Sequence, residues 1–192
     1  MKIIITENQY ELLKEMEDKP KVYNFPSLDV FGNEEPIDNW NLMQKFLSKK
    51  GNPEYTVDGD LDLEDTTIES LGNLTAVGGD LDLRGTLIKS LGNVTSVGGS
   101  LYLIHSKIES LGNLTSVGYN LHLTHSKIES LGNLISVGGY LDLRNTSIES
   151  LGNLISVGGD LYLEDTPISE KYTEEEIRSQ VKVEGKIYLW KL

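Results

Sequence analysis

The most constraining feature of this sequence is an internal repeat of 20 residues. Five consecutive blocks beginning at Leu61 share one pattern, and a sixth begins at Leu161. A fixed period of this length is typical of stacked repeat proteins. A single coil buries too few apolar side chains to offset the conformational entropy lost when it is ordered. We therefore expect successive coils to stack into one solenoid.

The repeat also indicates which residues face the interior. We number the positions of each block from 1, at its opening leucine. Leucines at positions 1 and 3 alternate with polar residues, which is typical of a strand with one buried face. Isoleucine at 8, leucine at 11, leucine or valine at 14 and valine at 17 complete an inward-facing set. The pattern predicts a mainly β, right-handed parallel solenoid with about seven L-x-L strands.

Other recurring residues are expected to serve the turns. Glycine occurs at positions 12, 18 and usually 19, where the chain must turn a corner or approach its neighbour closely. Asparagine at 13 and threonine or serine at 6 can satisfy backbone groups at bends. The serine at position 10 recurs in the same way, so no single serine is distinguished as a nucleophile.

The repeat resembles a known family. Its segment L-x-L-x-x-T/S-x-I-x-S-L is similar to the leucine-rich repeat core L-x-L-x-x-N-x-L, with threonine or serine where that family places asparagine. The tail L-x-N-L-x-S-V-G-G resembles the shortest bacterial leucine-rich repeats and the L domains of growth-factor receptors. The resemblance covers residues 54–168 and implies that the L-x-L strands form a face that binds partners. The opening MKIIITENQYELLKE also resembles openings of uncharacterised tailed-phage proteins, which implies a host or viral partner.

We expect three segments that fold as one unit. Residues 1–53 form an N-terminal cap, residues 54–170 the solenoid, and residues 171–192 a C-terminal cap. The N-terminal cap is predicted to contain a strand at 2–6, a helix to about Met16, and an amphipathic helix that ends before Gly51. Four side chains of the second helix are expected to cover the first coil: Trp40, Leu42, Phe46 and Leu47.

The C-terminal cap is predicted from two patterns. Thr173 and Glu176 have the spacing of a capping box, which indicates a short helix. The following V-E-G-K-I-Y-L repeats the spacing of V-G-G-D-L-Y-L, so Val183, Ile187 and Leu189 are expected on a final strand.

Composition limits the classes of function. The chain has 30 acidic and 17 basic residues, a net charge of −13 at pH 7, and no cysteine. Disulfides, thiolate metal sites and cysteine nucleophiles are excluded. The charge disfavours direct binding to nucleic acids or anionic membranes and favours a protein partner with a basic surface. The first residues lack the long apolar run of a secretory signal, so a cytoplasmic location is expected.

Candidate binding residues are found where the outward side of the L-x-L face departs from the repeat. The middle coils collect aromatic residues, an apolar residue and all three histidines, a composition that favours a protein-binding surface. The alternative is an ordinary solvated sheet of strand-forming residues. The candidate partner-binding residues are Tyr102, Ile104, His105, His122, Thr124, His125, Tyr140, Asp142 and Arg144.

Histidines and acids on the same face raise two further possibilities. His105 and His125 occupy one position on adjacent coils with His122 near, so a metal site is geometrically possible, although no metal-binding motif supports it. Solvated histidines are the alternative, as is pH sensitivity. An acidic patch on the first coils would be compensated by a basic partner or a cation, or would simply keep the first coils soluble. Its residues are Asp60, Asp62, Glu64, Asp80 and Asp82.

The sequence therefore favours a non-catalytic interaction module without a cofactor. No unique nucleophile, phosphate loop or metal motif is present, which makes a hydrolytic enzyme or a metal-binding protein the weakest interpretation. The alternative function is an acidic decoy that mimics nucleic acid and inhibits a DNA- or RNA-handling protein. The sequence leaves the oligomeric state open, with a monomer favoured.

Overall fold

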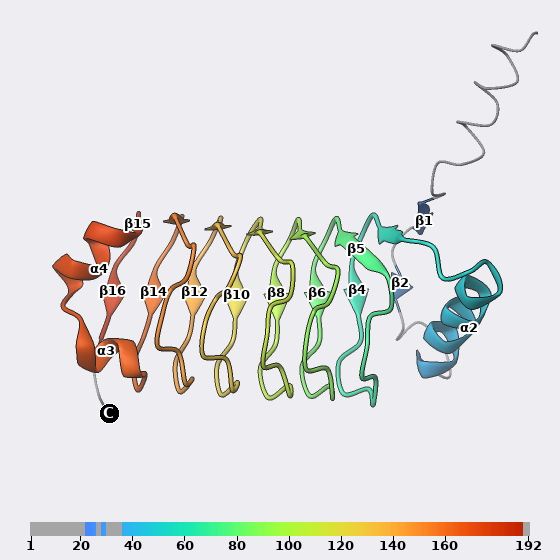
Figure 1. Ribbon diagram of the computed structural model, residues 1–192, viewed down its shortest axis with the longest axis horizontal. Helices are drawn as coiled ribbons and strands as arrows, with labels where there is room; N and C mark the ends of the chain where they lie inside the picture. Colours follow the sequence, from blue (N-terminus) through green and yellow to red (C-terminus); the bar gives the residue numbers. More distant parts are fainter. Residues whose placement is uncertain (1–21, 26–27, 30–35, 190–192) are drawn as a thin grey trace, which may run out of the picture.

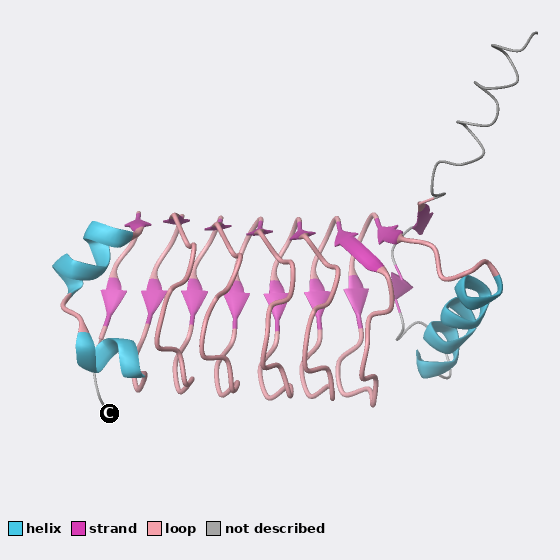
Figure 2. Ribbon diagram, in the orientation of Figure 1, coloured by secondary structure: helices cyan, strands magenta, loops and turns pink. Residues whose placement is uncertain are grey.

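The computed structural model describes residues 22–25, 28–29 and 36–189. The chain winds into a solenoid with two all-parallel sheets of eight strands each (Figures 1 and 2). We call the first the L-x-L sheet; its strands are β2 (Leu28–Asp29), β4 (Leu61–Asp62), β6 (Leu81–Asp82), β8 (Leu101–Tyr102), β10 (Leu121–His122), β12 (Leu141–Asp142), β14 (Leu161–Tyr162) and β16 (Ile187–Tyr188).

The second sheet, which we call the S-V sheet, is built around positions 16 and 17 of the repeat. Its strands are β1 (Tyr23–Phe25), β3 (Tyr55–Val57), β5 (Leu74–Val77), β7 (Ser96–Val97), β9 (Ser116–Val117), β11 (Ser136–Val137), β13 (Ser156–Val157) and β15 (Lys182–Val183). The sequence had identified position 17 as buried but had not assigned a strand there.

Like positions of successive coils pair in both sheets. Leu101 pairs with Leu81 and Leu121, and Val117 pairs with Val97 and Val137. The predicted parallel solenoid with 20-residue coils is therefore confirmed. The expected count of seven L-x-L strands is wrong, because β2 adds an eighth from a segment outside the repeat. The predicted right-handed sense of the coil stays a prediction.

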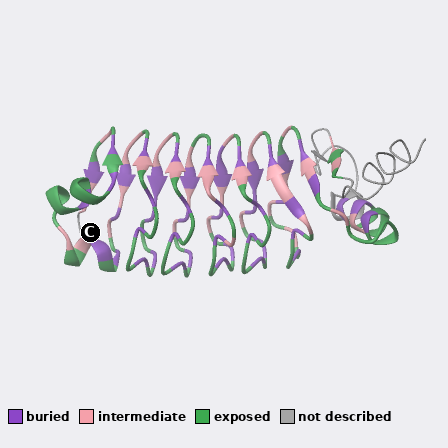
Figure 3. Ribbon diagram, turned by 45° about the horizontal axis from the view of Figure 1, so that its top comes forward, coloured by how far each residue is buried: buried purple, intermediate pink, exposed green. Residues whose placement is uncertain are grey.

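The six inward positions form a continuous core. In the coil that begins at Leu81, all six aliphatic side chains are at most 1% exposed. Figure 3 shows that buried residues recur on each coil from one end of the stack to the other. Burial of this regular set is the main source of stability, since each coil closes the apolar surface of its neighbours.

Glycines hold the corners for two different reasons. At position 12, Gly132 has a φ of +57°, in the left-handed region that side chains disfavour. At position 18, a Cβ on Gly138 would lie 2.1 Å from the carbonyl oxygen of Gly118 on the preceding coil. The first glycine permits a turn and the second permits close stacking.

Helix α2 (Pro36–Lys49) lies at the N-terminal end of the stack (Figure 1). Trp40, Met43 and Leu47 belong to the hydrophobic core, as expected for Trp40 and Leu47. The expectation for Leu42 and Phe46 is wrong, because they are 63% and 42% exposed. The buried face instead follows the i, i+3, i+7 spacing of one helix side. The strand predicted at 2–6 and the helix to Met16 lie outside the described residues.

The C-terminal end contains α3 (Pro167–Lys171) and α4 (Glu174–Gln180). The capping box predicted at Thr173 is present, with the Glu176 side chain accepting from the Thr173 backbone N–H. Val183 and Ile187 were expected on one strand, but they lie on β15 and β16, in different sheets. The V-E-G-K-I-Y-L segment repeats the end of one block and the start of the next, so it contributes to both sheets. None of the helices in the described part of the chain has the length and apolar content needed to cross a membrane.

Candidate interaction face

The outward side of the L-x-L sheet presents different residues on each coil. Position 2 points outward between the buried leucines, and strand register aligns its side chains in one row. From β4 to β16 this row is Asp62, Asp82, Tyr102, His122, Asp142, Tyr162 and Tyr188. Acidic residues therefore occupy the first coils and aromatic residues the remainder, apart from Asp142.

Aromatic rings form a continuous series along this row. The rings of Tyr102 and His122 are stacked with centroids 4.7 Å apart, and Tyr140 meets His122 edge-on at 4.9 Å. Tyr140 also contacts Tyr162 edge-on at 6.0 Å, and Tyr162 stacks on Tyr188 at 4.8 Å. We call these five residues the aromatic ladder. Such pairs favour fixed ring positions, so the ladder is a rigid surface.

His122 lies in the middle of the ladder and is half-buried. Its Nε2 atom is 2.8 Å from the Tyr140 hydroxyl oxygen. Burial lowers the pKa of His122 below its ordinary value; Asp142 and Asp82 oppose this shift, and Arg84 and Arg144 reinforce it. The imidazole is therefore mainly uncharged at neutral pH.

Two identical groups, which we call the Asp–Arg–Tyr modules, flank the central coils. In the first, Asp82 accepts hydrogen bonds from Arg84 Nε at 2.8 and 2.9 Å, and the guanidinium lies 5.6 Å from the Tyr102 ring centroid.

In the second module, Asp142 accepts from Arg144 Nε at 2.9 Å and from Nη2 at 2.6 Å. The Arg144 guanidinium lies 5.2 Å from the centroid of Tyr162. Both arginines are thus held between a carboxylate and a ring, a geometry suited to the planar guanidinium. The modules are three coils apart, about 14 Å at the usual strand spacing.

Asp142 is the most buried acid of the face, at 4% exposed. Burial raises its pKa, but hydrogen bonds from the Arg144 side chain and backbone outweigh that effect, so the pKa lies below its ordinary value. Asp142 is therefore ionised and serves to orient Arg144, which itself remains exposed.

Between the modules the face carries no ionised side chain at positions 2 and 4. Ile104 and Thr124 occupy position 4 of the two central coils, and both are partly buried. With His122 uncharged and Tyr140 beside it, the centre is an apolar and aromatic surface bounded by the two modules. This is the arrangement of protein-binding surfaces, in which a dehydrated centre is surrounded by polar groups.

His105 and His125 have a different origin from His122. Their φ values are +57° and +61°, and position 5 is in the left-handed region on every coil. The residues there are Asp65, Gly85, His105, His125, Asn145 and Asp165, which are types that tolerate this conformation. The two imidazoles are exposed and stacked at 5.4 Å. The left-handed backbone at position 5 therefore accounts for His105 and His125. His122 belongs to the aromatic ladder and not to this pair.

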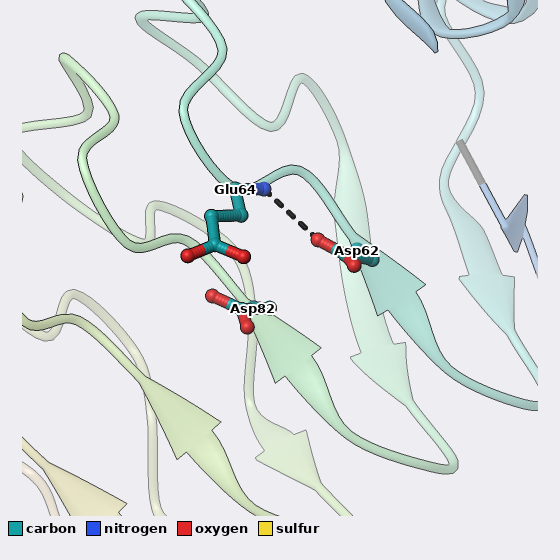
Figure 4. Close-up of side chains that lie close together, drawn as sticks. All are labelled: Asp62, Glu64 and Asp82. Carbon is teal, nitrogen blue, oxygen red and sulfur yellow. Dashed lines mark hydrogen bonds between the residues drawn. The ribbon is translucent and has the colours of Figure 1, made fainter. Parts of the chain in front are cut away.

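Three acids of the acidic patch, Asp62, Glu64 and Asp82, lie close together (Figure 4). Among the described residues they form the only group of three or more potential metal ligands whose ligand atoms all lie within 4.8 Å of one another. However, Arg84 Nη2 bonds to Glu64 at 2.9 Å and the same guanidinium pairs with Asp82, while Asp62 accepts the Glu64 backbone N–H. Arg84 of the chain itself therefore partly neutralises these acids, in addition to the basic partner or cation that the sequence left open.

Asp60 and Asp80 belong to the scaffold. Asp60 Oδ1 accepts the backbone N–H of Asp80 at 2.8 Å, and Asp80 Oδ1 accepts that of Ser100 at 2.6 Å. Asn120 accepts from the N–H of Tyr140 in the same way. Position 20 therefore requires a short acceptor on most coils. Tyr140 departs from that rule, because its hydroxyl is directed to His122 instead.

Sequence reasoning missed three residues of this surface. Tyr162 and Tyr188 extend the ladder, and Arg84 forms the first module. A signal was present, since L-D-L-R occurs twice and in each case the next coil places tyrosine at position 2.

The outward side of the S-V sheet is a shallow groove with a different character. Its lining runs from Thr56 to Glu184 and consists mainly of the serine, valine and glycine columns at positions 16, 17 and 18. These residue types recur on nearly every coil, so the groove follows from the close stacking of the coils.

No protein-family model matches this chain, and neither a characterised protein nor a solved structure is detectably similar to it.

Proposed function

We propose that this protein is a non-catalytic interaction module that binds another protein through the outward side of the L-x-L sheet. The observation that carries the proposal is the uncharged centre of Ile104, His122, Thr124 and Tyr140 between two Asp–Arg–Tyr modules. Rigid aromatic groups lose little entropy on binding, and tyrosine and arginine are enriched among residues that dominate binding energy.

The partner we propose has a basic rim around an apolar centre. The net charge of −13 attracts such a surface over long range, while the aromatic centre supplies the short-range contacts. His105 and His125 lie at the margin of this surface, because their position is set by the turn.

We propose further that the chain is of the leucine-rich repeat type and that it originates from a phage. We also propose that it acts in the cytoplasm, which for a phage protein is the host cytoplasm. The supporting features are the L-x-L-x-x-T/S-x-I core, the opening sequence and the absence of cysteine.

The test compares tyrosines on and off the face. Tyr102→Ala combined with Tyr140→Ala removes the two rings that contact His122, whereas Tyr119→Ala removes a tyrosine that is 64% exposed at another corner. Affinity capture from the native cell followed by titration of the recovered partner measures the effect. We expect the double variant to weaken binding at least about 100-fold, equivalent to two hot-spot side chains, and Tyr119→Ala to leave it unchanged. Equal binding by all three proteins contradicts the proposal.

The acidic decoy is the alternative, favoured by the net charge. Decoy binding would weaken steeply with salt and on neutralisation of Asp62 and Glu64, with little effect of the tyrosines. Asp60 and Asp80 are unsuitable for this test, because their carboxylates accept backbone hydrogen bonds from the next coil, whereas the bond that Asp62 accepts lies within its own coil. The same titration at two salt concentrations separates the two functions.

A further inference from the structure

Each coil of the S-V sheet presents the carbonyl groups of positions 15, 17 and 19 to N–H groups of the next coil. The position 17 carbonyl accepts the N–H of position 18, as in Gly158 to Val137 at 2.9 Å. The position 19 carbonyl accepts the N–H of position 19, as in Gly159 to Gly139 at 2.8 Å. The last strand β15 continues this pattern toward β13, through Glu184 to Val157 and Gly185 to Gly159.

Strand β15 is the last strand of the sheet, so within the described residues no further coil donates N–H groups to its carbonyl oxygens. The equivalent groups are the carbonyl oxygens of Val183 and Gly185. Arg178 on α4 donates from Nη1 to Val183 at 2.7 Å and from Nη2 to Gly185 at 2.8 Å. Its remaining donor, Nε, bonds to Glu174 one turn earlier at 2.8 Å.

One guanidinium thus occupies the place of two backbone N–H groups. Its planar fork directs donors on two separate nitrogens at two acceptors in a fixed geometry, whereas an ammonium group donates from a single nitrogen on a flexible stem. The capping box at Thr173 fixes the start of α4, and buried Ile177 anchors the helix next to Arg178. The contact is therefore part of a folded cap.

We propose that Arg178 terminates the solenoid and closes a docking edge for a second copy of this chain. An exposed strand edge recruits another strand, and proteins block such edges to remain monomeric. The occupant is a second copy because β15 has the register of the interior strands, which already accept a parallel neighbour of this same sequence pattern. Such a contact is heterologous and does not close on itself, so it continues into longer assemblies.

The test removes the donors while keeping the side-chain stem. Arg178→Met in the full chain is expected to show a mass that rises with concentration to dimers and larger species, measured by sedimentation velocity. The wild type stays at the monomer mass over the same range. Loss of a positive charge makes the chain more negative and opposes association, so charge does not explain the expected result.

Two further variants separate edge closure from helix stability. Glu174→Gln removes the ion pair within α4 but leaves both carbonyl contacts, and it is expected to remain monomeric. Arg178→Lys keeps the charge but replaces two donor nitrogens by one, so it is expected to hold the two carbonyl groups less well and to associate. A folded Arg178→Met or Arg178→Lys protein that stays monomeric overturns the proposal, with folding checked by circular dichroism. Association of Glu174→Gln equal to that of Arg178→Met also overturns it. Should Arg178→Met lose its fold, Arg178→Lys alone decides.

Discussion

The two sheets are made by the same repeat, yet their outward faces differ. On the S-V sheet, position 16 is serine on four successive coils, Ser96, Ser116, Ser136 and Ser156. On the L-x-L sheet, position 2 of the coils beginning at Leu81, Leu101, Leu121 and Leu141 is Asp82, Tyr102, His122 and Asp142. Both sets lie in register in a parallel sheet.

This difference distinguishes residues that are required for the stacking of the coils from residues that stacking does not require. Coils that must fit one another favour the same small residue at each contact, as the glycines at position 18 illustrate. The variable row is not required by stacking, since acids, tyrosines and a histidine all fit there. A residue that changes along an otherwise uniform stack therefore requires a reason outside the stack.

The largest expected effect is on the uniform side. Gly138→Ala places a Cβ 2.1 Å from the Gly118 carbonyl oxygen, so two coils must separate. We expect a loss of about 3 kcal/mol in the free energy of unfolding, at the upper end for overpacking. Denaturant unfolding measures it.

Two control substitutions test whether this loss of stability is specific to the close contact between coils at position 18. Gly132→Ala, in open space with φ +57°, is expected to cost about 1 kcal/mol. Ile104→Thr, which copies Thr124 on the variable face, is expected to change stability by less than about 0.5 kcal/mol. Equal losses for Gly138→Ala and Ile104→Thr would remove the distinction between the two faces.

The repeat made much of the fold predictable. Period, register and the six buried positions follow from self-similarity, because identical coils can stack only with like positions aligned. The S-V strands were missed because two residues per coil give no alternation to recognise. Strand β2, at Leu28–Asp29, lies outside the repeat, and α3 fills a corner that earlier blocks build with the sequence around L-G-N.

A second prediction restores the repeat at a residue that departs from it. Tyr140→Asn gives position 20 the acceptor that Asn120 supplies on the preceding coil, and it removes the contacts with His122 and Tyr162. The gained hydrogen bond offsets the lost ring contacts, so we expect stability to change by less than about 1 kcal/mol. Partner binding is expected to weaken at least about tenfold.

Tyr119→Gly is the matched control, since it also restores the usual residue, at position 19. It is expected to leave partner binding intact. Unchanged binding by Tyr140→Asn would show that a departure from the repeat does not identify this site.

The candidate site was less predictable than the fold. Sequence placed Tyr102, His122 and Tyr140 on one face, and the structure brings them into contact. It did not distinguish His122 from His105 and His125, because residue type alone does not give the sign of φ. The column of Asp, Gly, His and Asn at position 5 was a usable signal for a left-handed turn.

The smallest expected effect concerns the charge of His122, which is faced by Asp82, Asp142, Arg84, Arg144, the ring of Tyr102 and the hydroxyl group of Tyr140. Its folded pKa lies below the unfolded value of 6.5, first because of burial. Between these two values the unfolded chain binds more protons, so stability falls as pH decreases from 6.5 toward the folded pKa. His122→Phe keeps a ring on Tyr102 and lacks the proton, so it should lose this part of the pH dependence. His125→Asn, which copies the left-handed Asn145 of the next coil, should retain it. Denaturant unfolding at a series of pH values measures all three proteins. Parallel curves for the wild type and His122→Phe would show that protonation of His122 does not contribute to the pH dependence of stability.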